Sequence, residues 1–148
     1  SGLSWRTILA KREGFRADFA GFEIDKVARF GEADVQRLLQ DAGIVRHRGK
    51  IEAAIHNASR ALELQAEAGS LAAFFWGFEE RLPEGEFRAE SPGSRALSKA
   101  LRQRGWKFVG PTTAYAFMQA MGLVNDHAPD CAGHAAVQAA RRKFKPPR

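Results

Sequence analysis

The sequence predicts an all-α fold, a compact helical domain, on three observations. Apolar residues recur three and four positions apart, the spacing of one helix face, along most of the 148 residues. The alternation of apolar and polar residues that marks a half-buried strand does not recur. Serine, glycine and proline stand where helices would begin and end. With 45% hydrophobic residues, a chain of this length can bury a core of its own.

Composition narrows the class of protein without assigning a function. The formal net charge of +6 favours polyanionic partners such as nucleic acid, although many soluble proteins are mildly basic. Cys131 is the single cysteine, which excludes an intrachain disulfide and suits a reducing compartment. No apolar run approaches the roughly 20 residues that cross a bilayer, and Arg6, Lys11 and Arg12 interrupt the first stretch, unlike a signal peptide. We therefore expect a soluble, cytoplasmic monomer with no membrane partner.

Four helical segments are predicted in the first half of the chain. Ser4 is placed to cap the first, and Asp25 to cap a short turn over 26–30. The next helix stops at Gly43, and the longest ends near Gly69. The apolar residues that define these helices are Trp5, Ile8, Leu9, Phe15 and Phe19, then Val35, Leu38 and Leu39, then Ile51, Ile55, Ala58 and Leu62.

The second half begins with a fifth helix, capped by Ser70 and carrying core candidates in Phe74, Phe75, Trp76 and Phe78. A turn-rich stretch over 83–93 follows and predicts a loop. We expect one helical domain over 1–133 and a basic C-terminal tail over 134–148. The run 141–148 is predicted to lack fixed structure and to act, if at all, through nonspecific electrostatics.

Residues 94–121 predict two helices joined by a tight, glycine-bounded hairpin. Ser94 is placed to cap the first helix, and the run 104–110 breaks it. Pro111 suits the first position of the second helix. The inward-facing residues are expected to be Leu97 and Leu101 on the first helix, and Tyr115 or Phe117 with Met118 on the second.

Such a hairpin presents backbone N–H groups where the second helix begins, and these donors with the helix dipole favour an anion such as a DNA phosphate. Glycine allows the phosphate to approach closely because it has no Cβ. A plain corner between two helices is the alternative, and on spacing alone it is the more common case. The candidate DNA contacts are Gly105, Lys107, Gly110, Thr112 and Thr113.

Five segments together resemble the DNA-3-methyladenine glycosylase I family of the helix–hairpin–helix glycosylase superfamily. They occur in the family's order and span residues 1–5, 41–51, 96–101, 105–110 and 122–127. The resemblance implies packed helices with a base-accepting cleft beside the hairpin. It also implies base-excision repair of alkylated double-stranded DNA, in which the bond joining 3-methyladenine to deoxyribose is hydrolysed and an abasic site remains. The base must leave the duplex stack to reach such a pocket.

The resemblance implies roles for residues at the start of the chain. Trp5 matches the family tryptophan that stacks on the extruded base, and an indole face attracts the cationic, N3-methylated purine. On the pattern alone, Trp5 would instead be a core residue packed with Ile8 and Leu9. Gly2 and Leu3 match a turn that approaches the gap left by the flipped nucleotide, where an apolar wedge would hold the stack open. An ordinary entry of the chain into a helix is the alternative.

Two residues after the second helix are the catalytic candidates. Most superfamily members carry an aspartate there that assists loss of the base, whereas this sequence has Asn125 followed by Asp126. A cationic purine is already a good leaving group, so it needs less help from a carboxylate. We expect Asn125 to organise the backbone near the sugar, with Asp126 as the alternative if a carboxylate is required. Tyr115 and its neighbours occupy the region where bifunctional members use a lysine, which implies a monofunctional mechanism.

His127 and Cys131 have a spacing compatible with two ligands on one zinc ion. In the family these positions bind a structural zinc with another His and Cys near the N-terminus, and those two partners are not in this sequence. His134 is a substitute ligand, although a solvated histidine is the more common case. Zinc is therefore the implied cofactor, with an incomplete site.

The resemblance begins inside a motif, which implies that the family's N-terminal segment is missing from this sequence. In the family that segment carries a glutamate and aromatic residues that contact the base, so we expect this chain not to select its base normally. A non-catalytic helix–hairpin–helix DNA-binding module is the alternative function, and a helical protein-interaction domain is a third. Arg46, His47, Arg48 and Lys50 form a basic cluster that suits either DNA phosphate or a solvated helix face.

Overall fold

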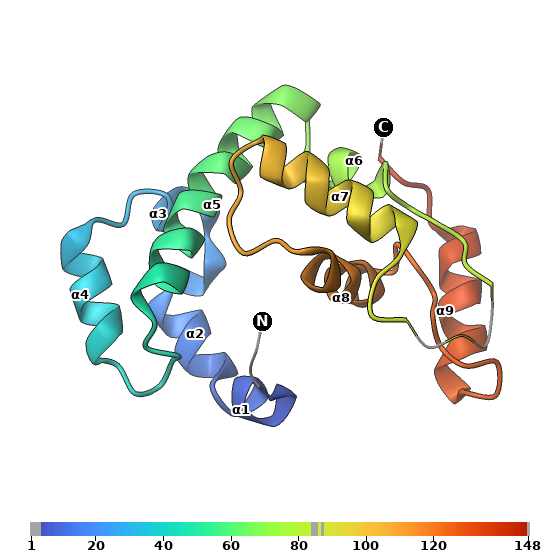
Figure 1. The fold of residues 1–148 in the computed structure, drawn as a ribbon, viewed down its shortest axis with the longest axis horizontal. Helices are drawn as coiled ribbons and strands as arrows, with labels where there is room; N and C mark the ends of the chain where they lie inside the picture. The colour runs from blue at the N-terminus through green and yellow to red at the C-terminus, as the bar shows by residue number, and fades with distance from the viewer. Residues whose placement is uncertain (1–3, 84–85, 87, 148) are drawn as a thin grey trace. The chain divides into compact units, whose positions relative to one another are not determined.

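The computed structural model describes residues 4–83, 86 and 88–147, and every regular element in these ranges is helical. This confirms the predicted all-α fold class. None of the helices described is long and apolar enough to cross a bilayer. The elements are α1 Trp5–Ala10, α2 Arg12–Asp18, the 3-10 helix η1 Ala20–Phe22, α3 Ile24–Val27, α4 Glu32–Gln40, α5 Arg48–Ala68, α6 Leu71–Trp76, α7 Pro92–Gln103, α8 Pro111–Met121 and α9 Ala132–Lys143 (Figure 1).

The chain divides into two compact units, and the described residues of the first are 4–63 and 105–108. Phe19 lies in its core, with the rings of Phe15 and Phe30 stacked at centroid distances of 6.2 and 6.4 Å. Helix α2 approaches the loop after α4 closely, since a Cβ on Gly14 would lie 2.5 Å from the carbonyl oxygen of Gly43. The buried core residues are Phe19, Val27, Val35, Leu38, Ile44 and Ile51.

The second unit comprises residues 64–104 and 109–147 as described. Its centre is the pair α7 and α8, which lie side by side (Figure 1). Leu97 and Leu101 are buried, as are Tyr115 and Met118 from α8. Of the two aromatic residues expected here, Tyr115 is the buried one, whereas Phe117 is half-buried with its ring 4.8 Å from that of Phe75.

Several predicted helix ends are confirmed. Ser4 Oγ accepts the Thr7 amide at 3.2 Å, and Ser70 Oγ accepts the Ala73 amide at 3.0 Å. The long helix α5 ends at Ala68, where Gly69 follows with φ +76°. Because helix starts and stops depend on local chemistry, the sequence alone specifies them well.

Two predicted caps are wrong by two or three residues. Helix α3 begins after Glu23, whose carbonyl oxygen accepts the amides of Lys26 and Val27, so Asp25 lies inside the first turn. Helix α7 begins after Ser91, because Pro92 suits a first helical position. Ser94 is the partner in a capping box: its Oγ accepts the Ser91 amide at 2.8 Å, and Ser91 Oγ accepts the Ser94 amide at 3.0 Å.

The expectation that the chain lacks fixed structure from Arg141 onward is wrong for residues 141–144. Residues 141–143 form the last turn of α9, a helix that begins at Ala132 and so spans the boundary expected at 133 and 134. Arg141 is 10% exposed and donates to Glu79 Oε1 at 2.8 Å and to the carbonyl oxygen of Glu80 at 3.1 Å. The Phe144 ring packs 4.5 Å from that of Trp76. A long-range ion pair and an aromatic contact therefore hold a segment whose composition is that of a solvated tail.

Candidate functional site

Trp5 is the first residue of α1, and its side chain is 73% exposed. None of the six residues of α1 is buried, and Leu9 is 59% exposed. The interpretation of Trp5 as a core residue is therefore wrong. An exposed indole on a capped helix can accept a flat, cationic ligand on its face. Gly2 and Leu3, the candidate wedge, lie outside the described residues.

The hairpin between α7 and α8 is held by α5 within the first unit. Asn57 donates from Nδ2 to the carbonyl oxygen of Lys107 at 2.9 Å and accepts the Lys107 amide at Oδ1, also at 2.9 Å. His56 Nε2 lies 2.9 Å from the carbonyl oxygen of Gly105. Gly105 has φ +81°, a conformation that favours glycine.

These contacts revise the predicted phosphate site. The Lys107 amide already has an internal acceptor, so its backbone is unavailable to a phosphate and only its exposed side chain can contact DNA. The Lys107 amide is therefore not one of the donors that an anion could use.

The start of α8 has the geometry of an anion site. Gly110 is its N-cap without a side-chain cap, Pro111 is its first residue, and the first turn contains no acidic residue. The first amide bonded into the helix is that of Ala114, to the carbonyl oxygen of Gly110 at 2.9 Å. The amides of Thr112 and Thr113 thus have no acceptor among the described residues, and both side chains are exposed. A Cβ on Gly110 would meet open space, so a ligand can approach this backbone.

The backbone just before α8 is fixed within the second unit. Ser98 is buried on α7, and its Oγ donates to the carbonyl oxygen of Val109 at 2.7 Å. This bond places the backbone immediately before Gly110. The start of α8 is therefore positioned by α7 and is not a free loop end.

The catalytic candidates Asn125 and Asp126 follow α8. Asn125 donates from Nδ2 to the carbonyl oxygen of His134 at 3.2 Å, and its Oδ1 lies 2.7 Å from Nδ1 of His127. Its amide thus organises the local chain, which agrees with one part of the expected role.

Asp126 is held by two donors. Arg88 Nη1 donates to Asp126 Oδ1 at 3.2 Å, and the Tyr115 hydroxyl donates to Asp126 Oδ2. The carboxylate is 11% exposed. Burial, reinforced by the bond to Asp126, raises the pKa of Tyr115 far above its ordinary value, so the hydroxyl stays a donor. A carboxylate committed to two donors is poorly disposed to act as a base, so this geometry favours a structural role.

The side chains of His127 and Cys131 both lie beside Gly133. A Cβ built on Gly133 would lie 3.0 Å from Nε2 of His127 and 3.7 Å from Sγ of Cys131. The two soft donors suit zinc by type. Among the residues that the structure describes, however, no group of three or more His, Cys, Asp or Glu side chains converges. Two donors do not fit the closed, four-ligand coordination of a structural zinc.

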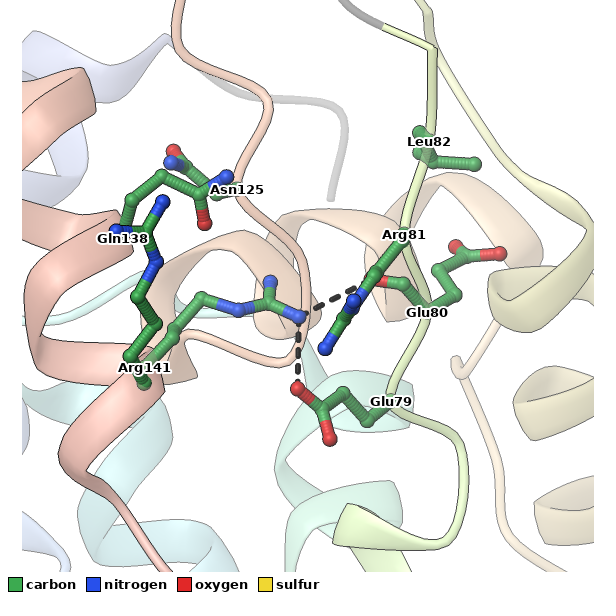
Figure 2. Close-up of a pocket in the computed structure, with 8 residues that line it drawn as sticks. Glu79, Glu80, Arg81, Leu82, Asn125, Gln138 and Arg141 are labelled. Carbon is green, nitrogen blue, oxygen red and sulfur yellow. Dashed lines mark hydrogen bonds and ion pairs between the residues drawn. The ribbon is translucent and has the colours of Figure 1, made fainter.

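A cleft of about 310 Å³ lies in the second unit between residues 79–82 and α9. Figure 2 shows Arg141 crossing this cleft to reach Glu79 and the backbone of Glu80. Asn125 lines it, but neither an aromatic side chain nor a hairpin residue does. Without a stacking surface, this cleft is not suited to a flat base. Its lining residues are Glu79, Glu80, Arg81, Leu82, Asn125, Gln138, Arg141 and Arg142.

Sequence reasoning missed the residues that position this site. His56 and Asn57 lie about fifty positions from the hairpin that they hold, and Arg88 lies 38 positions from Asp126. A polar pair on an otherwise amphipathic α5 was the available signal. Without the fold, such a pair cannot be distinguished from solvated side chains.

The comparisons with known proteins agree along most of the chain. The family model described as methyladenine glycosylase matches residues 1–134. DNA-3-methyladenine glycosylase 1 of Escherichia coli (strain K12) is 49% identical over 138 residues, which cover 88% of this chain and 74% of that protein. DNA-3-methyladenine glycosylase of Haemophilus influenzae is 41% identical over 88% of this chain and 75% of its own length.

Solved structures give the same result. A crystal structure of 3-methyladenine DNA glycosylase I superposes with a TM-score of 0.84 at 47% identity, covering 90% of this chain and 77% of the other. The Staphylococcus aureus enzyme, solved to explain 3-methyladenine recognition, superposes with a TM-score of 0.85 at 35% identity, covering 90% and 75%. The match reaches from the exposed tryptophan of α1 through the hairpin to the loop after α8, and on it the chain belongs to the methyladenine glycosylase family.

Proposed function

We propose that this protein is a DNA glycosylase that removes 3-methyladenine from alkylated duplex DNA and leaves an abasic site. The observation that carries the proposal is the 49% identity over 88% of the chain to a DNA-3-methyladenine glycosylase. The exposed indole of Trp5 and the uncapped start of α8 support it, because they offer a stacking face and an anion site.

Binding begins at the DNA backbone. The amides of Thr112 and Thr113 hold a phosphate where Gly110 leaves the backbone open to approach. The exposed Lys107 side chain is a further phosphate contact. Such contacts position the protein on the duplex and read no sequence. The methylated base then leaves the stack, a step that is easier for a damaged pair. The Trp5 face stacks on the extruded base, which carries a positive charge.

The chemical step is hydrolysis without a covalent enzyme intermediate. The bond from C1′ to the base nitrogen breaks with its electron pair going to the base, which thereby becomes neutral. Water supplies the oxygen that bonds to C1′, and a proton passes to solvent. Because the leaving group is cationic, little acid–base assistance is needed. Asn125 orders the loop and Asp126 anchors it, so neither has to transfer a proton.

We also propose His127 and Cys131 as a pair of zinc donors, and no step of the reaction passes through them. A bound zinc would brace the loop before α9 by tying these side chains together. Because the pair is only half of a tetrahedral set, the 148-residue chain is expected to bind zinc weakly. Chelation should then leave its melting temperature unchanged, and one tightly bound zinc per chain would contradict this.

Release of free 3-methyladenine from methylated duplex DNA tests the proposed function. The parent chain should release base and Trp5→Ala should release much less, while salt-dependent binding of undamaged duplex stays the same. Gly110→Asp should weaken binding of every duplex, because it places a negative charge at the anion site. Duplex binding without base release by the parent would favour the non-catalytic DNA-binding module instead.

A further inference from the structure

Two arginines that lack an anionic partner line the cleft between residues 79–82 and α9, here called the α9 cleft. Arg81 and Arg142 are exposed, and neither side chain makes an ion pair or hydrogen bond with any residue that the structure describes. Figure 2 shows the Arg81 side chain extending toward Arg141 and Glu79. Two unpaired cations that line one cavity raise its electrostatic potential, which favours an anionic ligand.

The Glu80 carboxylate does not neutralise these cations, because it is bonded at the start of α7. Its Oε2 accepts the Gly93 amide at 2.9 Å, and its Oε1 accepts the Ser91 hydroxyl. The positive end of the α7 dipole stabilises the negative charge there. A Cβ on Gly93 would lie 2.7 Å from the carboxyl carbon, so glycine is what allows this close approach. One of the two acids that line the α9 cleft is therefore committed to the fold.

Arg141 lines the same cleft as a fixed donor. Its side chain is 10% exposed, and its Nη2 donates both to Glu79 Oε1 at 2.8 Å and to the carbonyl oxygen of Glu80 at 3.1 Å. The N–H groups on Nη1 and Nε have no acceptor among the described residues. Gln138 lies one turn earlier on α9 and lines the cleft, and its side-chain amide likewise has no described partner. The α9 cleft thus combines a preorganised guanidinium with a free amide.

The size and polarity of the α9 cleft narrow the class of ligand. Its volume of about 310 Å³ is at the low end of small-molecule sites, which run from roughly 300 to 1,000 Å³. Leu82 is the one apolar residue among the described residues that line it. Polar groups withdrawn from water need hydrogen-bond partners, so a hydroxylated ligand is favoured over a hydrocarbon. The Glu79 carboxylate, which is 36% exposed, can accept such hydroxyls. The lining therefore suits a ligand with an anionic end and a hydroxylated end.

We propose that the α9 cleft binds a small sugar phosphate. Arg81 and Arg142 bind the phosphate together with the free N–H groups of Arg141, since guanidinium groups make paired, charge-assisted hydrogen bonds with phosphate oxygens. The Gln138 amide and the Glu79 carboxylate bind the sugar hydroxyls. A phosphomonoester carries a charge of about −1.5 to −2 at pH 7, which matches two unpaired cations. None of the described hairpin residues lines the cleft, so this site goes beyond the proposed removal of 3-methyladenine.

Calorimetric titration of the parent protein with ribose 5-phosphate tests the class of ligand. Inorganic phosphate and ribose are titrated separately in the same phosphate-free buffer. The parent should bind ribose 5-phosphate about 10-fold more tightly than inorganic phosphate, the effect of one or two additional neutral hydrogen bonds. Ribose should not bind detectably, because it lacks the anionic group. Equal affinity for ribose 5-phosphate and inorganic phosphate would overturn the assignment to a sugar phosphate.

The arginine contacts are tested with Arg81→Ala, Arg142→Ala and a matched control, Arg102→Ala. Arg102 is also exposed and has no described side-chain partner, but it lies on α7 and does not line the cleft. Each cleft variant should weaken ribose 5-phosphate binding by about 10- to 100-fold, because charge-assisted hydrogen bonds to the phosphate are lost. Arg102→Ala removes the same charge and should change the affinity by less than about 2-fold, because salt screens a charge that does not contact the ligand.

Failure of the folded parent to bind ribose 5-phosphate would overturn the proposal, as would equal losses in Arg142→Ala and Arg102→Ala. Both cleft arginines are exposed, so their alanine variants should melt within roughly 2 °C of the parent. Where a cleft variant melts lower, Arg81→Lys or Arg142→Lys is measured instead. Lysine keeps the charge but loses the paired hydrogen bonds, so it should weaken binding by about 3- to 10-fold. The titration contains no DNA, so its result does not depend on base release.

Discussion

The side-chain amide of Asn57 binds the backbone of Lys107 on both sides, donating to its carbonyl oxygen and accepting its amide, each at 2.9 Å. Fifty positions separate the two residues. This pair makes α5 the support of residues 105–108, so the turn proposed to bind DNA is preorganised. It also removes one amide from the set that can bind phosphate.

Replacing Asn57 tests this support. Asn57→Ala removes two hydrogen bonds from a partly buried site and should lower the free energy of unfolding by about 1–2 kcal/mol. Duplex affinity should fall as well, because the hairpin loses its fixed geometry. Asn57→Asp keeps the acceptor for the Lys107 amide and loses the donor to its carbonyl oxygen. The stability and the duplex affinity of this variant should therefore lie between those of the parent and of Asn57→Ala. Chemical denaturation and duplex titration measure the two effects, and parent-like values of both in Asn57→Ala would show that the hairpin holds itself.

Asp126→Asn distinguishes a structural role from a catalytic one. The variant keeps the shape of the side chain but weakens the charged bond from Arg88, so unfolding should become easier by about 1–3 kcal/mol. Base release, measured well below the melting temperature, should stay within a few-fold of the parent. A loss of about 100-fold or more in a folded Asp126→Asn would instead identify a catalytic carboxylate.

Asp18 links stability to pH. Burial, reinforced by the nearby Asp41, raises the pKa of Asp18 above its ordinary value near 3.8 despite the bond from Arg37. A raised pKa means that the protonated form is favoured by folding, so this contribution is complete below the ordinary pKa and is lost as pH rises through the folded one. At pH 7, Asp18→Asn should therefore melt above the parent, by roughly 2–4 °C for each 1 kcal/mol gained. The difference should vanish below about pH 4, and a difference that grew on acidification would contradict this assignment.

Arg141→Ala tests whether the C-terminal helix is docked. The side chain is 10% exposed and reaches both Glu79 and the backbone of Glu80. Its loss should destabilise the protein by about 1–3 kcal/mol, because charge-assisted bonds at a buried position disappear. Arg142→Ala, one position further along α9 but exposed, is the matched control and should change stability by less than about 0.5 kcal/mol. Equal melting temperatures for both variants would mean that the bonds from Arg141 to Glu79 and Glu80 do not stabilise the protein.

Local chemistry was readable from the sequence, and long-range contacts were not. The caps at Ser4 and Ser70 were predictable because each serine bonds an amide three residues away. The cap of α7 was predicted at Ser94, whereas it is Ser91, because both serines take part in one capping box. Arg141 was assigned to an unstructured tail because its partner, Glu79, lies 62 positions earlier. For the candidate site, the sequence indicated which residues are candidates. It did not indicate that Arg88 and Tyr115 donate hydrogen bonds to Asp126.

The sequence by itself determined the all-α class, the positions of most helices, the glycine-bounded hairpin and the family resemblance, since these depend on residue order and short-range bonding. Only the tertiary structure decided which polar groups are already paired. It shows that the Lys107 amide and the Asp126 carboxylate are occupied, whereas the Trp5 indole and the Phe108 ring are exposed. The physical reason is that a side chain's availability depends on which distant residues fold against it, and residues fifty positions apart leave no local pattern.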